Sequence, residues 1–203
     1  MGEAPSTRMS LLVRIRDSRD GEAWSWFVEV YGPLVYDYGR WHGLQDADAA
    51  DLAQEILRTV AAAAGKFAYD QQRGSFRSWL FTVARTRRID LEGRRARPAR
   101  TSGDLVVADQ LDHVPAQGAE LEEDEWRLAY RRRLFDWAAE RARGEFRDST
   151  WQAFRQTALE GLGPREVARD LGMSVGAVYM AKSRVLARLQ ELIDQLRGDD
   201  EDR

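Results

Sequence analysis

Apolar side chains recur at steps of three and four residues along most of the chain, which is the spacing of one face of a helix. The first run covers residues 24–38, with Gly32-Pro33 as a predicted joint. Two more amphipathic helices are expected, from Asp46 to about Ala64 and from Phe76 to about Arg95. No convincing strand alternation is present, so the pattern predicts an all-α fold. The inward positions expected in the third segment are Trp79, Leu80, Val83 and Ile89.

The helical spacing breaks down after Arg97-Pro98, where Gly, Pro and acidic residues take over. Residues 99–121 are therefore predicted to form an acidic flexible linker. Helical spacing resumes at Trp126 and continues to about Leu196. The expected architecture is two small helical domains joined by this linker, and its parts are residues 8–98, 99–121, 122–197 and an acidic tail over 198–203.

Residues 163–189 have the spacing of a helix-turn-helix. Pro164 suits the first helical position, Ala168 permits close helix approach, and Gly172 suits a left-handed turn. Ser174 is expected to cap the second helix. An ordinary pair of helices joined by a Gly turn is the alternative that this window alone leaves open. The small core expected beneath the motif consists of Val167, Leu171, Met173, Val175 and Val178.

The second helix of this motif is placed to enter a DNA major groove. Its side chains then divide between base edges and phosphates. The residues expected at base edges are Ser174, Gly176, Tyr179, Met180, Ser183 and Arg184, and those expected at phosphates are Arg165, Lys182 and Arg188.

Composition excludes several function classes. The 203 residues include no Cys and two His, which rules out disulfides, Cys-ligated metals, a Cys nucleophile and a His-rich metal site. No cofactor or metal is expected. The acidic cluster Glu122–Glu125 has no His, Cys or Gly-rich phosphate loop to complete a site, so an enzyme is not expected. Without a long apolar run or a cleavable leader, the chain is predicted to be a soluble cytoplasmic protein with no membrane insertion.

Charge is distributed unevenly around a formal net value of -3. Residues 101–125 hold no Lys or Arg against 8 Asp or Glu, whereas residues 126–197 hold 14 against 9. Seven Arg lie between Arg85 and Arg100. Because aromatic residues precede this basic run, it suits unstacked or single-stranded DNA. A solvated helix end is the structural alternative, so the charge alone indicates an anionic partner and no more.

Four segments in order resemble the extracytoplasmic-function (ECF) sigma factors of bacterial RNA polymerase, over about Leu11 to Leu196. They are DAADLAQEILRTV, GSFRSWLFTVARTRRID, the acidic linker and the helix-turn-helix. The resemblance implies an alternative sigma factor that directs core polymerase to specific promoters and assists DNA melting. A stand-alone helix-turn-helix regulator that does not bind polymerase is the alternative. The implied partners are core polymerase, through its β′ clamp and β flap, promoter DNA and an anti-sigma protein.

The resemblance also assigns roles to individual positions. The first segment would dock on the β′ clamp, although a polar row of this kind is often only a solvated face. The second would capture a flipped base of the minus-ten element and hold the DNA backbone, and the helix-turn-helix would bind the minus-thirty-five element. The implied polymerase-binding residues are Asp48, Asp51, Gln54, Glu55 and Arg58, and the implied minus-ten residues are Tyr69, Arg73, Ser75, Phe76, Arg77, Arg85, Thr86, Arg87 and Arg88.

Three features depart from the family pattern or extend it. Thr86 stands where the family usually has Asn, and this difference puts the upstream minus-ten preference in doubt. Residues 179–181 are Tyr-Met-Ala where members often have Lys-Ser-Arg, so the base-facing surface is unusually apolar and suits thymine methyl groups. The acidic linker suits a displaceable segment in a nucleic-acid path, and plain solubility explains it equally well.

Overall fold

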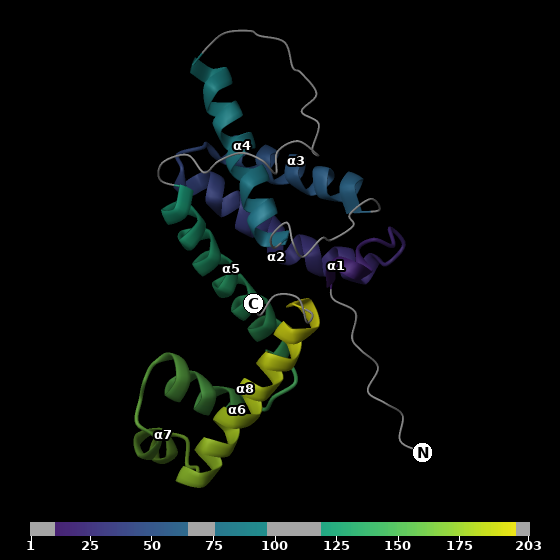
Figure 1. The fold of residues 1–203 in the computed structure, drawn as a ribbon. Coiled ribbons are helices and arrows are strands. Elements are labelled where there is room, and N and C mark those ends of the chain that lie inside the picture. The colour runs from purple at the N-terminus through teal and green to yellow at the C-terminus, as the bar shows by residue number, and fades with distance from the viewer. Residues whose placement is uncertain (1–10, 65–75, 97–118, 198–203) are drawn as a thin grey trace. The chain divides into compact units, whose positions relative to one another are not determined.

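The computed structural model of the protein describes residues 11–64, 76–96 and 119–197, and every regular element in these ranges is a helix (Figure 1). The predicted all-α fold is confirmed. The contacts divide the chain into two compact units that meet in sequence between Arg133 and Leu134. We call them the N-terminal unit and the C-terminal unit and describe each by itself. The expected tail over 198–203 lies outside the described residues.

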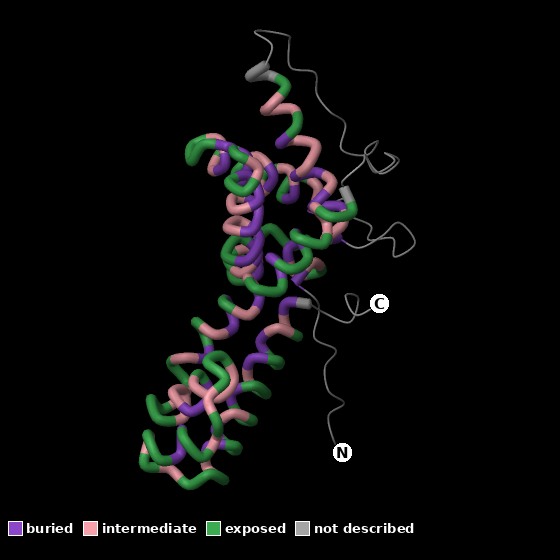
Figure 2. Tube along the Cα trace, turned by 90° about the vertical axis from the view of Figure 1, so that its left-hand side faces the viewer, coloured by how far each residue is buried: buried purple, intermediate pink, exposed green. Residues whose placement is uncertain are grey.

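The N-terminal unit is built from α1 (Leu11–Arg14), α2 (Gly21–Trp41), α3 (Asp46–Ala64), α4 (Phe76–Ala96) and the first part of α5 (Ala119–Arg143). The predicted bounds of the second and third amphipathic segments are confirmed by α3 and α4. Helix α2 packs chiefly against α3, and α3 against α4. Figure 2 shows buried positions recurring along the helices between exposed ones, as their amphipathic spacing requires.

Helix α2 continues through Gly32-Pro33, so the joint expected there is not formed. A proline inside a helix removes one backbone hydrogen bond at a cost of about 3 kcal/mol. Here Val30 and Tyr31 before the proline, and Leu34 and Val35 after it, are all buried. Because both halves of the helix pack into one core, tertiary packing outweighs the local penalty.

An aromatic cluster fills the N-terminal unit. The ring of Tyr31 lies 4.6 Å from that of Phe27 and 5.7 Å from that of Phe76, measured between centroids. In α4 the inward face differs from the expected one, since Ile89 is 43% exposed and Arg88 only 8%. Leu80, Ala84 and Arg88 follow one another at four-residue steps, so they lie on the same face of the helix, and all three are buried. The Arg88 guanidinium lies over the Tyr38 ring, 5.6 Å from its centroid.

The first part of α5 packs within the N-terminal unit, whereas the sequence places residues 122–197 in one C-terminal domain. Trp126 and Tyr130 are each only 1% exposed, and the Tyr130 ring stacks on Tyr31 with 5.5 Å between centroids. The predicted linker lies outside the described residues up to 118, and Ala119 already begins α5. Helical spacing predicts that α5 forms, but it does not indicate which apolar surface the helix will cover.

The C-terminal unit contains the rest of α5, then α6 (Asp148–Phe154), the π-helical turn η3 (Arg155–Leu159), α7 (Pro164–Asp170) and α8 (Val175–Arg197). Helices α6 and α7 both pack against α8, which is the expected arrangement of a helix-turn-helix. Thr157 in η3 donates its hydroxyl hydrogen to the Ala153 carbonyl at 2.6 Å, which ties the π-helical turn back to α6.

The turn between α7 and α8 has the predicted local chemistry. Pro164 begins α7, and Gly172 has a φ of 62° in the turn. The Ser174 hydroxyl accepts a hydrogen bond from the Ala177 backbone N–H at 3.1 Å, so the predicted cap is confirmed. One core prediction is wrong, because Val175 is 37% exposed at the start of α8. The packed cluster is Ala153, Val167, Ala168, Val178 and Ala181, with Leu162, Leu171 and Met173 partly buried against it.

No helix within residues 11–64, 76–96 or 119–197 is both long enough and apolar enough to span a membrane.

Candidate functional site

The outer face of α3 carries the residues expected to dock on polymerase. Leu52, Ile56 and Val60 are buried, which directs the opposite face of the helix outward. Arg58 donates a hydrogen bond of 2.8 Å to the Gln54 side chain, one turn away. The structure therefore brings the five predicted side chains to the outward side of one helix, with Asp51, Gln54 and Arg58 exposed and Asp48 and Glu55 half-buried.

Helix α4 lies beside this face and carries the predicted DNA contacts. Arg87 of α4 forms an ion pair with Glu55 of α3, with 3.2 Å between Nη1 and Oε1. This pair joins a residue assigned to DNA with one assigned to polymerase. The two predicted surfaces of the N-terminal unit are therefore adjacent.

The start of α4 is anchored in the core. Phe76 is buried and its ring lies 5.4 Å from the Trp79 ring, so it supports the helix rather than facing outward. The Arg77 guanidinium lies 5.1 Å from the centroid of the Tyr130 ring, in the geometry of a cation–π contact. Three residues expected in the base pocket lie outside the described residues, namely Tyr69, Arg73 and Ser75.

Thr86, at the position where ECF sigma factors usually have Asn, is half-buried and faces its own helix. Its hydroxyl donates a hydrogen bond of 2.9 Å to the Thr82 carbonyl, and Thr82 does the same to Ser78. Threonine in a helix commonly donates its hydroxyl hydrogen to a carbonyl of the preceding turn in this way. Thr86 consequently keeps only acceptor capacity for a ligand, and Asn would have offered a donor as well.

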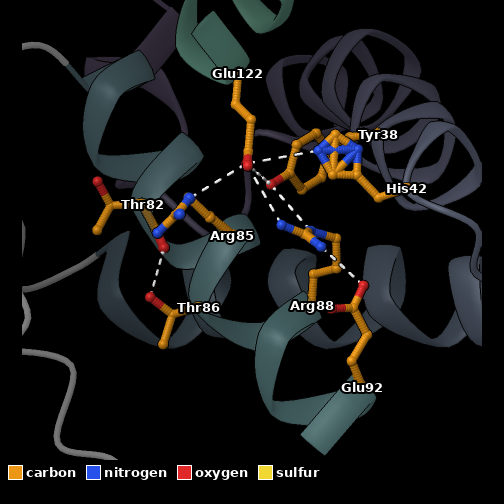
Figure 3. Close-up of polar contacts among 8 residues, drawn as sticks. All are labelled: Tyr38, His42, Thr82, Arg85, Thr86, Arg88, Glu92 and Glu122. Carbon is orange, nitrogen blue, oxygen red and sulfur yellow. Dashed lines mark hydrogen bonds and ion pairs between the residues drawn. The ribbon is translucent and has the colours of Figure 1, made fainter. Parts of the chain in front are cut away.

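Arg85 and Arg88 meet at one carboxylate, as Figure 3 shows. Oε2 of Glu122, on α5, lies 3.2 Å from Nε of Arg85 and 3.4 Å from Nη2 of Arg88. The Tyr38 hydroxyl donates to the same oxygen at 3.1 Å, and Nε2 of His42 lies 3.5 Å from it. We call Tyr38, His42, Arg85 and Arg88 the anion pocket, because all four surround a single anionic oxygen.

The groups of the anion pocket are held in fixed positions and charge states. Nε of Arg88 donates to the Tyr38 hydroxyl at 3.2 Å, and Nη1 donates to Glu92 at 2.8 Å. Burial opposes the charge of Arg88, but these hydrogen bonds outweigh it and raise its pKa. Burial raises the pKa of Tyr38 to about 12, and burial lowers the pKa of His42. At neutral pH Arg88 is therefore charged, whereas the Tyr38 phenol and the His42 imidazole are neutral.

Sequence reasoning missed half of this pocket. Tyr38 and His42 lie one turn apart at the end of α2, where the helical period counts Tyr38 as core. Glu122 belongs to a run of acidic residues whose members look alike in the sequence. Nothing in the spacing distinguishes the carboxylate that faces Arg85. Within the described residues, no group of His, Cys, Asp or Glu could hold a metal ion.

The helix-turn-helix presents the predicted DNA face outward. Tyr179 and Met180 are 58% and 60% exposed, an unusual degree for large apolar side chains. Arg188 is held by ion pairs, since it donates two hydrogen bonds of 2.7 Å to Glu145 and one of 3.1 Å to Glu191. The remaining predicted residues that are exposed are Arg165, Ser174, Gly176, Ser183 and Arg184, and Lys182 is half-buried.

Comparison with known proteins finds related sequences along the chain. The sigma-70 region 2 family matches residues 27–97, which include both α3 and α4. ECF RNA polymerase sigma factor RpoE of Cereibacter sphaeroides is 27% identical over 184 residues, 91% of this chain and 92% of that protein. ECF RNA polymerase sigma factor BldN of Streptomyces coelicolor is 26% identical over 192 residues, 94% of this chain and 68% of that protein. The solved structure of CnrH in complex with the cytosolic domain of CnrY aligns with 91% of this chain and 95% of that chain, at 21% identity and a TM-score of 0.34.

Proposed function

We propose that the chain is an ECF sigma factor that directs bacterial core RNA polymerase to specific promoters and assists DNA melting there, which its similarity to sigma-70 region 2 and to two ECF sigma factors supports. In this role the protein confers recognition and the polymerase performs the chemistry, so the chain itself is not a catalyst. Its place of action would be the cytoplasm, where polymerase and DNA are found.

The observation that carries this proposal is the adjacency of two unlike surfaces in the N-terminal unit. The outward face of α3 suits a protein partner, because Asp51, Gln54 and Arg58 are exposed polar groups above a buried apolar stripe. Helix α4 beside it carries Arg85, Arg87 and Arg88, whose guanidinium groups are suited to phosphates. A factor that joins DNA to polymerase needs both kinds of surface close together, and here they lie within one compact unit.

The individual contacts follow the family assignment. The outward face of α3 would bind the β′ clamp, and α4 with the segment before it would bind the minus-ten element. The helix-turn-helix would bind the minus-thirty-five element and the β flap. The exposed side chains of Tyr179 and Met180 favour contact with thymine methyl groups. An anti-sigma protein that sequesters the factor is a further expected partner.

A stand-alone regulator is the second candidate function. The complete helix-turn-helix, with its cap and its exposed base-facing surface, favours it as a specific observation. The two functions differ in one measurable respect. A stand-alone regulator binds its DNA by itself, whereas a sigma factor of this kind binds promoter DNA tightly only when it is assembled with polymerase.

Size-exclusion co-elution with sigma-free core polymerase tests the proposal. The wild-type chain should co-elute, and the Asp51→Lys/Glu55→Lys double variant should not. The matched control is Asp136→Lys/Glu140→Lys, which makes the same charge change at the same spacing on exposed positions of α5. If the wild type fails to bind, the stand-alone regulator is favoured. If the α3 variant binds as well as the wild type, the assigned docking face is wrong.

A further inference from the structure

Glu122 fills the anion pocket of the N-terminal unit. In Figure 3 its side chain reaches from α5 toward Arg85 on one side and toward Tyr38, His42 and Arg88 on the other. All four contacts, between 3.1 and 3.5 Å, are made by the same oxygen, Oε2. One oxygen atom therefore holds α5 against two arginines that the proposed function assigns to the DNA backbone.

The geometry suits a phosphate oxygen as well as a carboxylate oxygen. Both are anionic acceptors, and arginine side chains and phenols donate to either. Arg88 is also held by Tyr38 and Glu92, so the position of its guanidinium does not depend on Glu122 alone. Tyr38 and Arg88 can therefore exchange one anion for another while keeping the hydrogen bond between them.

We propose that Tyr38, Arg85 and Arg88 form a binding site for a phosphate of the DNA backbone, which Glu122 occupies while α5 is docked, so that docked α5 and bound DNA exclude each other. The inference rests on the proposed function for its ligand. It adds a site that includes Tyr38 and a competing group, Glu122, supplied by the chain itself.

One buried N–H group of docked α5 has no hydrogen-bond partner within the described part of the chain, and this favours release of the helix. Trp126 and Tyr130 bury their rings, which stabilises the docked helix. Yet Nε1 of Trp126 is buried and, among the described residues, has no hydrogen-bond partner. A buried N–H without a partner opposes burial, and undocking would return it to water. The docked state is thus held by buried rings and by a replaceable ion pair, and it is opposed by a buried N–H that gains a partner on leaving.

Binding of DNA by the isolated full-length chain tests the competition. The probe is a fluorescein-labelled single-stranded oligonucleotide of mixed sequence, measured by anisotropy at one fixed salt concentration. Glu122→Gln should tighten binding about tenfold, within the usual range for coupling between two sites. Glu120→Gln is the matched control, because it makes the same charge change at an exposed position of the same helix. Adding Arg85→Ala to Glu122→Gln should remove the gain.

A cross-link provides a second measurement that does not alter the pocket. The Ser78 hydroxyl donates to the Glu123 side chain at 2.9 Å, so these positions meet when α5 is docked. Because the chain has no Cys, a Ser78→Cys/Glu123→Cys variant presents only this pair to a short bis-maleimide that contains a cleavable disulfide. The cross-linked chain should bind the oligonucleotide at least about fivefold more weakly than the same sample after reduction.

The outcomes separate this inference from the proposed function. Equal effects of Glu122→Gln and Glu120→Gln would show only general electrostatics and would overturn the inference. Unchanged or weaker binding by Glu122→Gln, or equal binding before and after cleavage of the cross-link, would overturn it too. Neither assay contains polymerase. If the chain fails to co-elute with polymerase but both assays give the expected changes, the phosphate site stands and the sigma role falls.

Discussion

Arg87 of α4 and Glu55 of α3 form an ion pair with 3.2 Å between Nη1 and Oε1, and it joins the two helices that the proposed function assigns to DNA and to polymerase. The two side chains are 20% and 42% exposed. An ion pair this open to water adds little to folding stability, typically about 0–1 kcal/mol. Both residues are therefore open to substitution without loss of the fold.

Glu55→Gln should separate function from stability. We expect the free energy of unfolding, measured by urea denaturation, to change by less than about 1 kcal/mol because the pair is partly exposed. The affinity for core polymerase, measured by titration, should fall because a charged group of the docking face is lost. A large loss of stability with unchanged polymerase affinity would show that Glu55 is a structural residue.

Tyr38 should make stability sensitive to alkaline pH. Burial raises its pKa to about 12 from an ordinary value near 10. Because the folded state favours the neutral phenol, this contribution is complete below about pH 10 and is lost as pH rises toward 12. Ultraviolet titration of Tyr38→Phe should lack one of the late-ionising tyrosines of the wild type. An identical titration curve for the variant would contradict the assignment.

Replacing either of two glycines in the helix-turn-helix by alanine should change the stability of the C-terminal unit, in opposite directions. Gly172 has a φ of 62°, so Gly172→Ala should destabilise the C-terminal unit by about 1 kcal/mol or more. Gly176 lies in the first turn of α8, and an added Cβ would only touch the Ser174 hydroxyl oxygen at 4.0 Å. Gly176→Ala should therefore stabilise by about 0.5–1 kcal/mol, since alanine is the better helix former. Thermal unfolding followed by circular dichroism measures both, and shifts of the same sign would contradict this account.

The sequence predicts the helices more reliably than it predicts their partners. Residues 46–64 and 76–95 were expected as helices because their apolar positions keep one period throughout, and α3 and α4 confirm them. The break expected at Gly32-Pro33 is absent. The local preference of Gly-Pro opposes a helix there, but burial on both sides of the proline outweighs this preference.

In the candidate site, too, the sequence predicts positions within one helix better than contacts between helices. Asp51 and Arg58 lie on the outward face of α3 as expected, because helical periodicity fixes the face of each residue. The pairing of Glu122 with Arg85 bridges 37 positions in the sequence, and only tertiary packing selects that carboxylate from its acidic neighbours. The helix face on which a residue lies was thus predictable, whereas contacts between side chains of different helices were not.

Transcription from a library of fragments of the source genome by core polymerase tests the central claim most directly. The sigma account predicts that adding the chain creates new transcript starts, all preceded by a shared pair of upstream elements at constant spacing. These starts should vanish with the Asp51→Lys/Glu55→Lys variant and persist with Asp136→Lys/Glu140→Lys. The account would be contradicted if the chain produced no new starts, or if it bound its preferred fragments equally well without polymerase.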